Sequence, residues 1–329
     1  MDKTPDNQRP VRILAATNAS YATPLCVMLV SVACNLGKNR RLEIYIIDSG
    51  ISARDRENIA ASLRANRRGF REEDVHWLAL DLTPIRDMVV DDHLSVETYS
   101  RLLAPDLLPA DCDRILYLDC DLVAIKDVAE IYDAITDQKI VLAVQDIGIP
   151  FVDDPGGVFN YIELGISPDR PYFNGGVLGI NMRRWREKEI SKRILEYLRR
   201  YKDQIHYHDQ GGMNAILHDE WGQLDLIWNQ CTYPILHPEI WARAGYKRAD
   251  WARVRDHAAI IHYSGSEKPW NIRRINKPRG IFFFRYFNKT AYRGTIKEPC
   301  PETIFGYRIY FFLWRMVRKI VYALRGLPP

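Results

Sequence analysis

The chain has 329 residues, of which 47% are hydrophobic and 27% charged, and its net charge is +4. This composition is ordinary for a globular protein and can build a sizeable core in one large or two small domains. The first ten residues, MDKTPDNQRP, lack the apolar run of a signal peptide. The six cysteines form no CxxC pair, which argues against a zinc site and, without a secretory signal, against a disulfide framework. We therefore expect a cytoplasmic protein with a flexible segment at residues 1–10 and reduced thiols.

Five short apolar runs in the first half of the chain predict buried β-strands. They cover residues 12–17, 42–48, 75–81, 114–121 and 140–146. Helical spacing of apolar residues predicts helices over 24–36, 54–64 and 96–103. This alternation of strand and helix implies a mainly parallel α/β sheet with helices on both faces.

The pattern loosens after residue 150. Residues 151–157 predict a loop, and residues 172–185 combine a Gly-rich turn, a strand and the start of a helix. An amphipathic helix is predicted over 190–201 and a shorter helix over 208–217. A late strand over 259–265, AIIHYSG, is expected to run into a tight turn.

Acidic residues follow three of the predicted strands. Asp48, Asp146 and the pair Asp119 and Asp121 all stand at predicted carboxyl ends. In open α/β sheets the ligand-binding crevice lies at these ends, so the acids mark a candidate site. Acids also favour turns, and for Asp48 this structural role remains an equal alternative.

The strongest local signal is Asp119-Cys120-Asp121 after the apolar run RILYL. Where a strand ends and the chain turns, both carboxylates can reach one divalent cation. Hard oxygen ligands suit Mg²⁺ or Mn²⁺, which commonly bridge to the phosphates of a substrate. A buried strand before the motif strengthens this interpretation.

The segment HYSGSEKPW (262–270) adds an imidazole, a glycine turn and a lysine. His262 can complete the metal shell, and a nitrogen ligand beside carboxylates favours Mn²⁺. Gly265 lets the backbone approach a ligand, and Lys268 can neutralise phosphate. The alternative is a core histidine with a surface lysine.

Two further motifs offer polar groups for a sugar. Asn174, followed by Gly175, presents both a donor and an acceptor on a backbone that a ligand can approach closely. Asp209 and Gln210 open a predicted helix, and Arg101 can pair with a carboxylate or phosphate. The structural alternative is an ordinary turn for Asn174 and Gly175, and a helix cap for Asp209 and Gln210.

Several enzyme classes lose support because their motifs are absent. The chain contains no GxSxG, P-loop or HExxH sequence. GGVLGI is not a dinucleotide-binding fingerprint, since it precedes a strand instead of following one. Hydrolase, NTPase and dehydrogenase functions are therefore disfavoured.

Six ordered motifs resemble family 8 retaining glycosyltransferases, which include glycogenin and bacterial transferases that extend the lipopolysaccharide core. The motifs are AATNASYATPL, TYSRLLAPDLLP, DRILYLDCDLV, YFNGGVLGINMRRW, YHDQGGMNAIL and HYSGSEKPW. The bacterial lipooligosaccharide galactosyltransferases look most similar. The resemblance covers residues 11–272 and implies a GT-A fold, a UDP-sugar donor (UDP-galactose or UDP-glucose), Mn²⁺ (or Mg²⁺) as cofactor, and a saccharide or glycolipid acceptor.

The resemblance also implies roles for individual residues. Asp119, Asp121 and His262 would bind the metal, with Cys120 between the aspartates near the donor. The uridine would be held by Ala16, Asn18 and Tyr21, and the diphosphate by Gly265 and Lys268. The donor sugar would contact Arg101, Asp146, Asn174, Gly175, Asp209 and Gln210.

The chain departs from its bacterial relatives at several of these positions. Asn18 replaces an Asp, Ser20 replaces an Asn, and Gly175 replaces an Ala found in many members. An amide at position 18 still pairs with the uracil edge. Gln210 lies where a nucleophile would be expected, but an amide is a poor one. We therefore expect front-face attack by the acceptor hydroxyl, with Asp209 and Gln210 stabilising the sugar cation.

The last part of the chain is strongly basic. Residues 270–329 contain thirteen Lys or Arg and two Glu, a net charge of +11, whereas residues 1–269 carry −7. On a helical wheel, residues 305–326 separate five cations from an apolar and aromatic face, as in helices at a membrane interface. We expect residues 273–329 to place the protein on the inner face of the cytoplasmic membrane. Packing of this helix on the body is the alternative.

Three other functions fit parts of the sequence. A sugar nucleotidyltransferase needs a basic Gly-rich loop after its first strand, which AATNASYATP does not provide. Binding to nucleic acid through the basic tail is disfavoured by the tail's apolar face. The remaining alternative is a non-catalytic module that binds a nucleotide sugar or a lipid.

Overall fold

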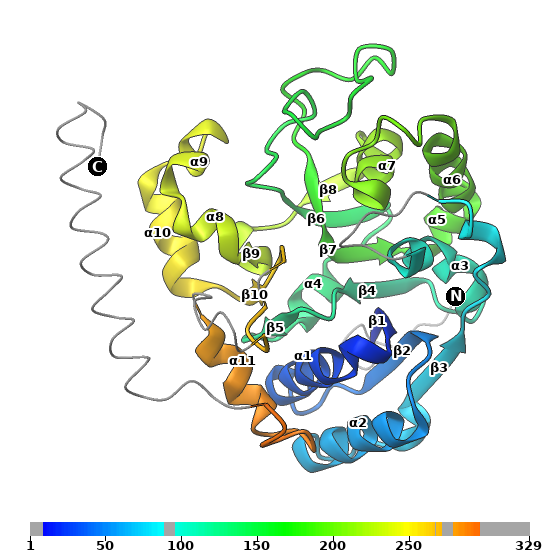
Figure 1. The fold of residues 1–329 in the computed structure, drawn as a ribbon, viewed down its shortest axis with the longest axis vertical. Helices are drawn as coiled ribbons and strands as arrows, with labels where there is room; N and C mark the ends of the chain where they lie inside the picture. Colours follow the sequence, from blue (N-terminus) through cyan, green and yellow to red (C-terminus); the bar gives the residue numbers. More distant parts are fainter. Residues whose placement is uncertain (1–8, 89–95, 267, 272–278, 297–329) are drawn as a thin grey trace.

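The computed structural model describes residues 9–88, 96–266, 268–271 and 279–296. A seven-stranded sheet lies at its centre, in the order β3-β2-β1-β4-β7-β6-β8 (Figure 1). The strands are β1 Val11–Asn18, β2 Leu42–Ser49, β3 Val75–Ala79, β4 Arg114–Leu118, β6 Val141–Gln145, β7 Phe173–Asn181 and β8 Trp221–Gln223. Four of the six pairings are parallel, and β7 is antiparallel to both of its neighbours. The predicted mainly parallel sheet is confirmed.

Side chains of the central strands alternate between two hydrophobic clusters, one on each face of the sheet. In β1, Ile13 belongs to one cluster and Leu14 to the other, and in β2 the same holds for Ile44 and Tyr45. This period of two follows from the pleat of a strand. Because both faces are apolar, helices must cover both, as the sequence predicted.

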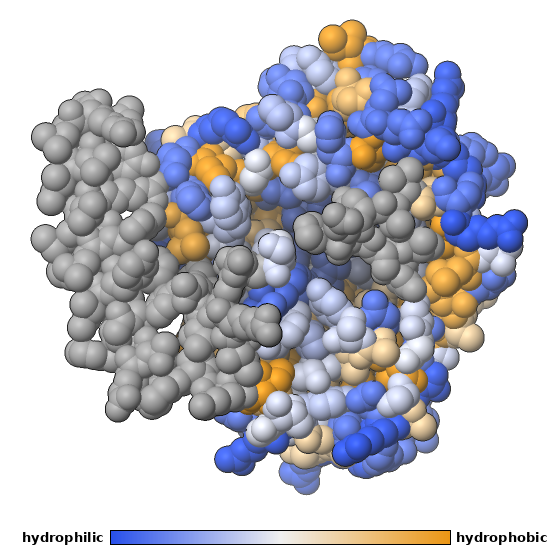
Figure 2. Space-filling view, viewed as in Figure 1, coloured by the Kyte–Doolittle hydropathy of each residue, from blue (hydrophilic) through white to orange (hydrophobic). Residues whose placement is uncertain are grey.

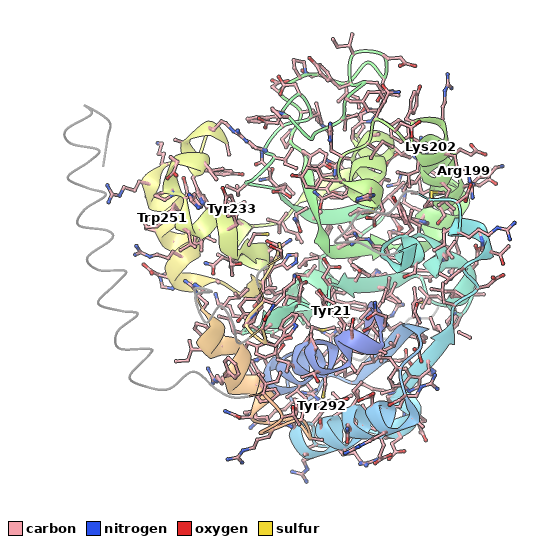
Figure 3. The ribbon with its side chains drawn as sticks, viewed as in Figure 1. Tyr21, Arg199, Lys202, Tyr233, Trp251 and Tyr292 are labelled. Atoms are coloured by element: carbon pink, nitrogen blue, oxygen red, sulfur yellow. The ribbon has the colours of Figure 1, made fainter. Side chains whose placement is uncertain are left out.

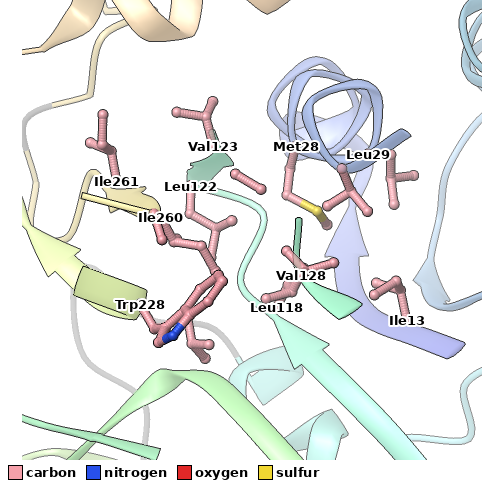
Figure 4. Packing of buried hydrophobic residues seen from close by; sticks show 14 of the residues in the cluster. Ile13, Met28, Leu29, Leu118, Leu122, Val123, Val128, Trp228, Ile260 and Ile261 are labelled. Carbon is pink, nitrogen blue, oxygen red and sulfur yellow. The ribbon is translucent and has the colours of Figure 1, made fainter. Parts of the chain in front are cut away.

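The first cluster is covered by the helices α1 and α2. α1 spans Ala22–Asn35 and α2 spans Ala53–Asn66. Eleven of the fourteen residues of α1 are buried, so this helix is apolar almost all round. Met28 and Leu29 of α1 lie close to Ile13 of β1 in this cluster (Figure 4).

The second cluster is covered by shorter helices. They are the 3₁₀ helix η5 Val96–Leu103 and the α-helices α3 Ala104–Leu107, α5 Met182–Glu187, α6 Ile190–Arg200 and α7 His208–Leu217. The helix predicted over 96–103 therefore forms as a 3₁₀ helix. The predicted helices over 190–201 and 208–217 are confirmed within one residue.

A second sheet of three short strands lies beside the first, in the order β5-β10-β9. It contains β5 Leu122–Ala124, β9 Gln230–Cys231 and β10 Ile260–His262. β10 pairs antiparallel with β5 and parallel with β9. The predicted late strand is β10, which joins this small sheet, and Ile260 and Ile261 extend the first hydrophobic cluster (Figure 4).

Several elements were not predicted from the sequence. They include the strands β5, β8 and β9, the helices α3, α4 Ala129–Asp133, α8 Thr232–Leu236, α9 Pro238–Arg243 and α10 Arg248–His257, and the 3₁₀ helices η2 Ala19–Tyr21, η3 Glu72–Asp74, η4 Thr83–Ile85 and η6 Leu226–Asn229. α8, α9 and α10 form a helical group next to the small sheet (Figure 1). The strand predicted to residue 121 ends at Leu118, because Asp119-Cys120-Asp121 turns the chain from β4 into β5.

The described part of the basic segment packs on the body. α11, Gly280–Phe287, contacts α1, and its aromatic residues Phe283, Phe284, Tyr286 and Phe287 are buried. The Tyr286 hydroxyl also accepts a hydrogen bond of 2.7 Å from the Asn35 side chain. The amphipathic helix expected over 305–326 lies outside the described residues.

The surface is mostly hydrophilic on the face shown in Figure 2, with small separate groups of hydrophobic residues. The five cysteines in the described ranges are free, as expected for reduced thiols. A search of the described residues finds no helix that is both long and apolar enough to span a membrane.

Candidate functional site

Asp119 and Asp121 lie in the turn between β4 and β5, at the carboxyl end of the central strand β4. The Asp119 amide donates to the Gly176 carbonyl at 2.9 Å, and the Tyr117 hydroxyl donates to Asp119 Oδ1 at 2.7 Å. The Tyr263 amide donates to the Asp121 carbonyl at 2.8 Å. The turn is therefore held from both sheets, which directs the two carboxylates to one place.

His262 completes this cluster from the end of β10. Its Nε2 lies 3.1 Å from Asp121 Oδ1 and 3.7 Å from Asp119 Oδ2. Ligand atoms of the three residues lie within 4.8 Å of one another, close enough for one cation to reach all of them. The other ring nitrogen, Nδ1, lies 3.0 Å from Asn229 Oδ1. This partner leaves Nε2 to face the carboxylates, as in protein metal sites where the second nitrogen is held by another group.

Gly176 packs directly against His262 and Asp119 of the cluster. A Cβ at this position would lie 2.3 Å from His262 Cε1 and 2.8 Å from Asp119 Oδ2. Any side chain here would displace the imidazole or the carboxylate. The donor set of two carboxylates and one imidazole, packed on a bare backbone, fits a small divalent cation.

Lys268 adds positive charge beside the cluster. Its ammonium donates to Asp121 and, at 2.9 Å, to the Tyr263 carbonyl. Burial raises the pKa of Asp121, but His262 and Lys268 outweigh that effect and hold it below its usual value. Burial instead dominates at Asp119, whose pKa is raised. The two carboxylates therefore have different environments, and Asp121 is the one held ionised by cations.

Arg101 lies on the other side of Asp119. Its Nε donates to Asp209, its Nη1 donates to the Gly175 carbonyl at 2.6 Å, and Nη1 lies 3.5 Å from Asp119 Oδ1. Burial lowers the pKa of Arg101, but Asp209, Tyr117 and Asp119 raise it well above the usual value. This guanidinium is therefore a fixed positive charge that joins η5, β7 and α7.

A second contact joins η5 to α7. The Tyr99 hydroxyl lies 2.9 Å from Nδ1 of His208, a buried residue with a left-handed backbone (φ 42°). Tyr99–His208 and Arg101–Asp209 together hold the start of α7. They fix the place of Gln210, the next residue.

Asp146, Asn174 and Gln210 form one hydrogen-bonded group. Asp146 Oδ2 accepts from Asn174 Nδ2 at 2.9 Å and from Gln210 Nε2 at 3.3 Å. Gln210 Oε1 accepts from the Gly175 amide at 2.8 Å. The pairing of β7 with β6 shifts between Leu178 and Asn174, and this irregularity brings Asn174 and the glycines to the site.

The residues expected to hold uridine lie at the end of β1. The Ala16 carbonyl accepts a weak hydrogen bond from the Cys120 thiol at 3.2 Å, so it adjoins the metal-binding turn. Asn18 caps the short 3₁₀ helix that follows, accepting from the Ser20 amide at 3.1 Å. Tyr21, at the start of α1 (Figure 3), has its ring centroid 5.9 Å from that of Trp270 in an edge contact.

The structure therefore brings most of the predicted site residues together at the edge of the sheet where the parallel strands β1, β4 and β6 end. Gly265 has the left-handed backbone of a tight turn (φ 85°) and is exposed three residues before Lys268. Asp48, left open between two roles, accepts from the Gly50 and Ile51 amides and pairs with Arg56. These contacts stabilise the turn after β2, so the structural alternative holds for Asp48.

Three residues at the site were missed by the sequence reasoning: Asn229, Tyr117 and Gly176. Tyr117 was visible only as an apolar strand residue, and Gly176 only as part of a glycine turn. Asn229 stands in WNQC, a sequence with no recognisable pattern. Its position depends on β9 pairing with β10, which no local signal predicts.

Comparisons with known proteins place this chain in a family. A model described as glycosyl transferase family 8 matches residues 12–273. The chain is 27% identical over 292 residues to general stress protein A of Bacillus subtilis (strain 168), covering 88% of this chain and 96% of that protein. It is 24% identical over 263 residues to lipopolysaccharide 1,2-glucosyltransferase of Escherichia coli (strain K12), covering 79% and 73%.

The fold gives the same result. The structure of galactosyltransferase LgtC in complex with donor and acceptor sugar analogs matches with a TM-score of 0.71 and 25% identity. The match covers 89% of this chain and 98% of that one. The expected GT-A fold is therefore confirmed, and the chain belongs to glycosyl transferase family 8, as a glycosyltransferase.

Proposed function

We propose that this glycosyltransferase moves galactose or glucose, with retention of configuration, from a UDP-sugar to a saccharide or glycolipid acceptor. The observation that carries the proposal is the convergence of Asp119, Asp121 and His262 beside the polar group around Asp146. A galactosyltransferase solved with sugar analogs and a lipopolysaccharide glucosyltransferase are both similar to this chain. They support a hexose donor and a role in lipopolysaccharide or another cell-surface glycan.

Asp119, Asp121 and His262 would hold Mn²⁺, which the imidazole favours over Mg²⁺. When bound, this ion would neutralise charge on the diphosphate leaving group. Lys268, already charged and anchored by Tyr263, would stabilise the same charge as it develops. Ala16, Asn18 and Tyr21 at the end of β1 would hold the uridine, and Gly265 would let the backbone approach the diphosphate.

Arg101, Asp146, Asn174 and Gly175 would orient the donor sugar. Gln210 is held by the Gly175 amide and by Asp146, so its side chain has a fixed direction. An amide stabilises a sugar cation through its oxygen dipole, whereas it is a poor nucleophile. Asp209 supplies negative charge. The acceptor hydroxyl attacks on the face from which UDP leaves, and its proton passes to the departing diphosphate oxygen as the bond from the sugar to that oxygen breaks.

We also propose that the basic residues after α11 hold the protein on an anionic membrane surface. Their charge and the amphipathic pattern of residues 305–326 support this, as does the access it gives to a glycolipid acceptor.

The direct test is a panel of UDP-sugars, including UDP-galactose and UDP-glucose, scored for UDP release with and without Mn²⁺. We expect one of the two UDP-hexoses to be hydrolysed slowly when Mn²⁺ is present. UDP release should become faster when a saccharide acceptor is added. Binding of UDP-sugars without any release of UDP would instead support the non-catalytic binding module.

A further inference from the structure

Asn229 connects the metal-binding cluster to the sugar-binding group. Within the described residues, it is the only side-chain amide that contacts a residue of each. It is the last residue of η6, directly before β9, and is buried. Its Oδ1 lies 3.0 Å from His262 Nδ1, and its Nδ2 donates to Asn174 Oδ1 at 2.8 Å. The amide therefore spans the space between β10 and β7.

These contacts belong to a continuous network with a defined direction. Asp146 Oδ2 is the acceptor in its contacts with Asn174 and Gln210, so Asn174 must turn its Nδ2 toward Asp146 and its Oδ1 toward Asn229. Asn174 Oδ1 also accepts from the Gly176 amide at 3.0 Å, which fixes the same orientation. Asn229 must then present Nδ2 to Asn174, which leaves its Oδ1 facing His262.

The orientation of Asn229 decides which nitrogen of His262 carries the proton. An amide oxygen accepts, so in the neutral imidazole that binds a cation Nδ1 must be the protonated nitrogen, and Nε2 would present its lone pair to a cation held by Asp119 and Asp121. Asp146 thus fixes the orientation of the Asn174 amide, and Asn174 fixes the orientation of the Asn229 amide. Asn229 in turn fixes the tautomer of His262. At the other end, Asp146 also accepts from Gln210.

We infer that Asn229 is a positioning residue that couples the metal-binding histidine to the donor-sugar site. It acts on neither the metal nor the sugar directly. Its oxygen holds His262 in the tautomer that binds a cation, and its NH₂ group holds Asn174 in the orientation that binds the sugar. This inference rests on the proposed function, because it assigns one residue to the support of both halves of that site.

Two substitutions separate the two contacts. Asn229→Asp keeps an oxygen for His262 Nδ1 but removes the donor to Asn174, whereas Asn229→Leu removes both. The matched control is Asn160→Leu, the same change at another buried asparagine, whose Oδ1 accepts from the Tyr197 hydroxyl at 2.6 Å and which is not part of this network. Each variant is titrated with Mn²⁺ by electron paramagnetic resonance, and UDP-sugar hydrolysis is measured at saturating Mn²⁺.

For Asn229→Asp we expect Mn²⁺ affinity within about threefold of the unmodified protein and kcat/KM lower by about 10- to 100-fold. For Asn229→Leu we expect both Mn²⁺ affinity and kcat/KM to fall by about 10- to 100-fold. Asn160→Leu should leave both Mn²⁺ affinity and kcat/KM unchanged. A purely structural role would lower the melting temperature of both Asn229 variants and would not separate the two readouts.

The coupling is overturned if both Asn229 variants bind Mn²⁺ equally weakly, or if both retain full kcat/KM. If Asn229→Leu does not fold, Asn174→Ala replaces it, since loss of that acceptor frees the Asn229 amide to rotate and should weaken Mn²⁺ binding. Unchanged Mn²⁺ affinity in Asn174→Ala would then overturn the inference. Failure of the proposed function looks different, because the unmodified protein itself would neither bind Mn²⁺ nor release UDP.

Discussion

Gly176 and His262 are in such close contact that the backbone of β7 shapes the metal-binding cluster. A Cβ at position 176 would lie 2.3 Å from His262 Cε1, a distance that a packed imidazole cannot tolerate. We expect Gly176→Ala to displace His262 and to lower the Mn²⁺-dependent release of UDP by at least about 100-fold, as 1 Å misplacements can do. The measurement is kcat/KM over a range of Mn²⁺ concentrations.

The matched control for this change is Gly179→Ala, three residues along the same strand. A Cβ at Gly179 would contact Ile131 and Ile135 at 3.1–3.4 Å, away from the metal-binding cluster. It should lower stability modestly and leave the Mn²⁺ dependence intact. Equal losses of activity in the two variants would argue against a specific role for Gly176.

Asp121 is held ionised by His262 and Lys268, so we predict that its removal abolishes metal-dependent transfer. Asp121→Ala should lose activity at every Mn²⁺ concentration while the far-ultraviolet circular dichroism spectrum stays unchanged, because the backbone of the turn is held by Tyr263. Near-normal activity in protein freed of contaminating metal would remove Asp121 from the metal-binding residues.

Arg101 makes three contacts that a lysine cannot reproduce, since an ammonium is a single point of charge on a flexible chain. We expect Arg101→Lys to lower kcat/KM by about 100-fold, because Asp209 and the Gly175 carbonyl can no longer be bound together. Arg199→Lys is the control, since Arg199 is a partly exposed side chain of α6 paired with Asp87 (Figure 3). A small effect of Arg101→Lys would mean that charge alone, and not the geometry of the guanidinium, is required.

The sequence predicted those site residues that stand directly after, or at the end of, an apolar strand. Asp119 and Asp121 come after an apolar run, and His262 ends another, so each was recognisable as a strand-end residue from its local pattern, although the pairing of β10 with β5 that brings them together is long-range. The sequence did not predict Asn229, which lies 33 residues from His262 and 55 from Asn174 along the chain. Its role depends on the pairing of β9 with β10, and such long-range pairing has no local signal.

The same distinction explains the fold. The central strands were predicted because both faces are buried and their apolar runs are continuous. The position of β7 between β4 and β6, antiparallel to both, was not predicted. Its sequence FNGGVLGIN predicts a strand but does not show which strands it pairs with in the sheet. The helices α8 and α9 were missed because they are short, and α10 because only two of its ten residues, Trp251 and Val254, are buried and give it little apolar pattern.

Asp74 makes the stability of the protein sensitive to acid. It is buried between the half-exposed Arg41 and Arg71, with contacts of 2.6 and 2.9 Å. Burial raises the pKa of Asp74, but hydrogen bonds from the two arginines outweigh it and lower the pKa below the usual value. A lowered pKa in the folded state contributes stability that is complete above the unfolded value, near 4, and is lost as pH falls below it.

We therefore expect Asp74→Asn to lower the free energy of unfolding by about 1–2 kcal/mol at pH 7 and by less at pH 3. Urea unfolding of both proteins at the two pH values measures the difference. Asp203→Asn, at an exposed position, should change stability little at either pH. A penalty for Asp74→Asn that grows toward acid pH would contradict the proposed origin of the sensitivity.

The packing of α11 on α1 divides the basic segment into two parts with different expected roles. Removing residues 297–329 leaves α11 in place, so we expect a folded protein that hydrolyses UDP-sugar normally but no longer floats with anionic liposomes. Removing residues 273–329 also removes Phe283, Phe284, Tyr286 and Phe287 from the core. Each buried aromatic side chain contributes about 1.5–3 kcal/mol, so this shorter protein should be strongly destabilised.

The flotation assay has two further informative outcomes. Flotation that persists without residues 297–329 would place membrane binding elsewhere on the molecule. Flotation of the full-length protein that is lost in high salt would show that charge alone holds the protein on the membrane.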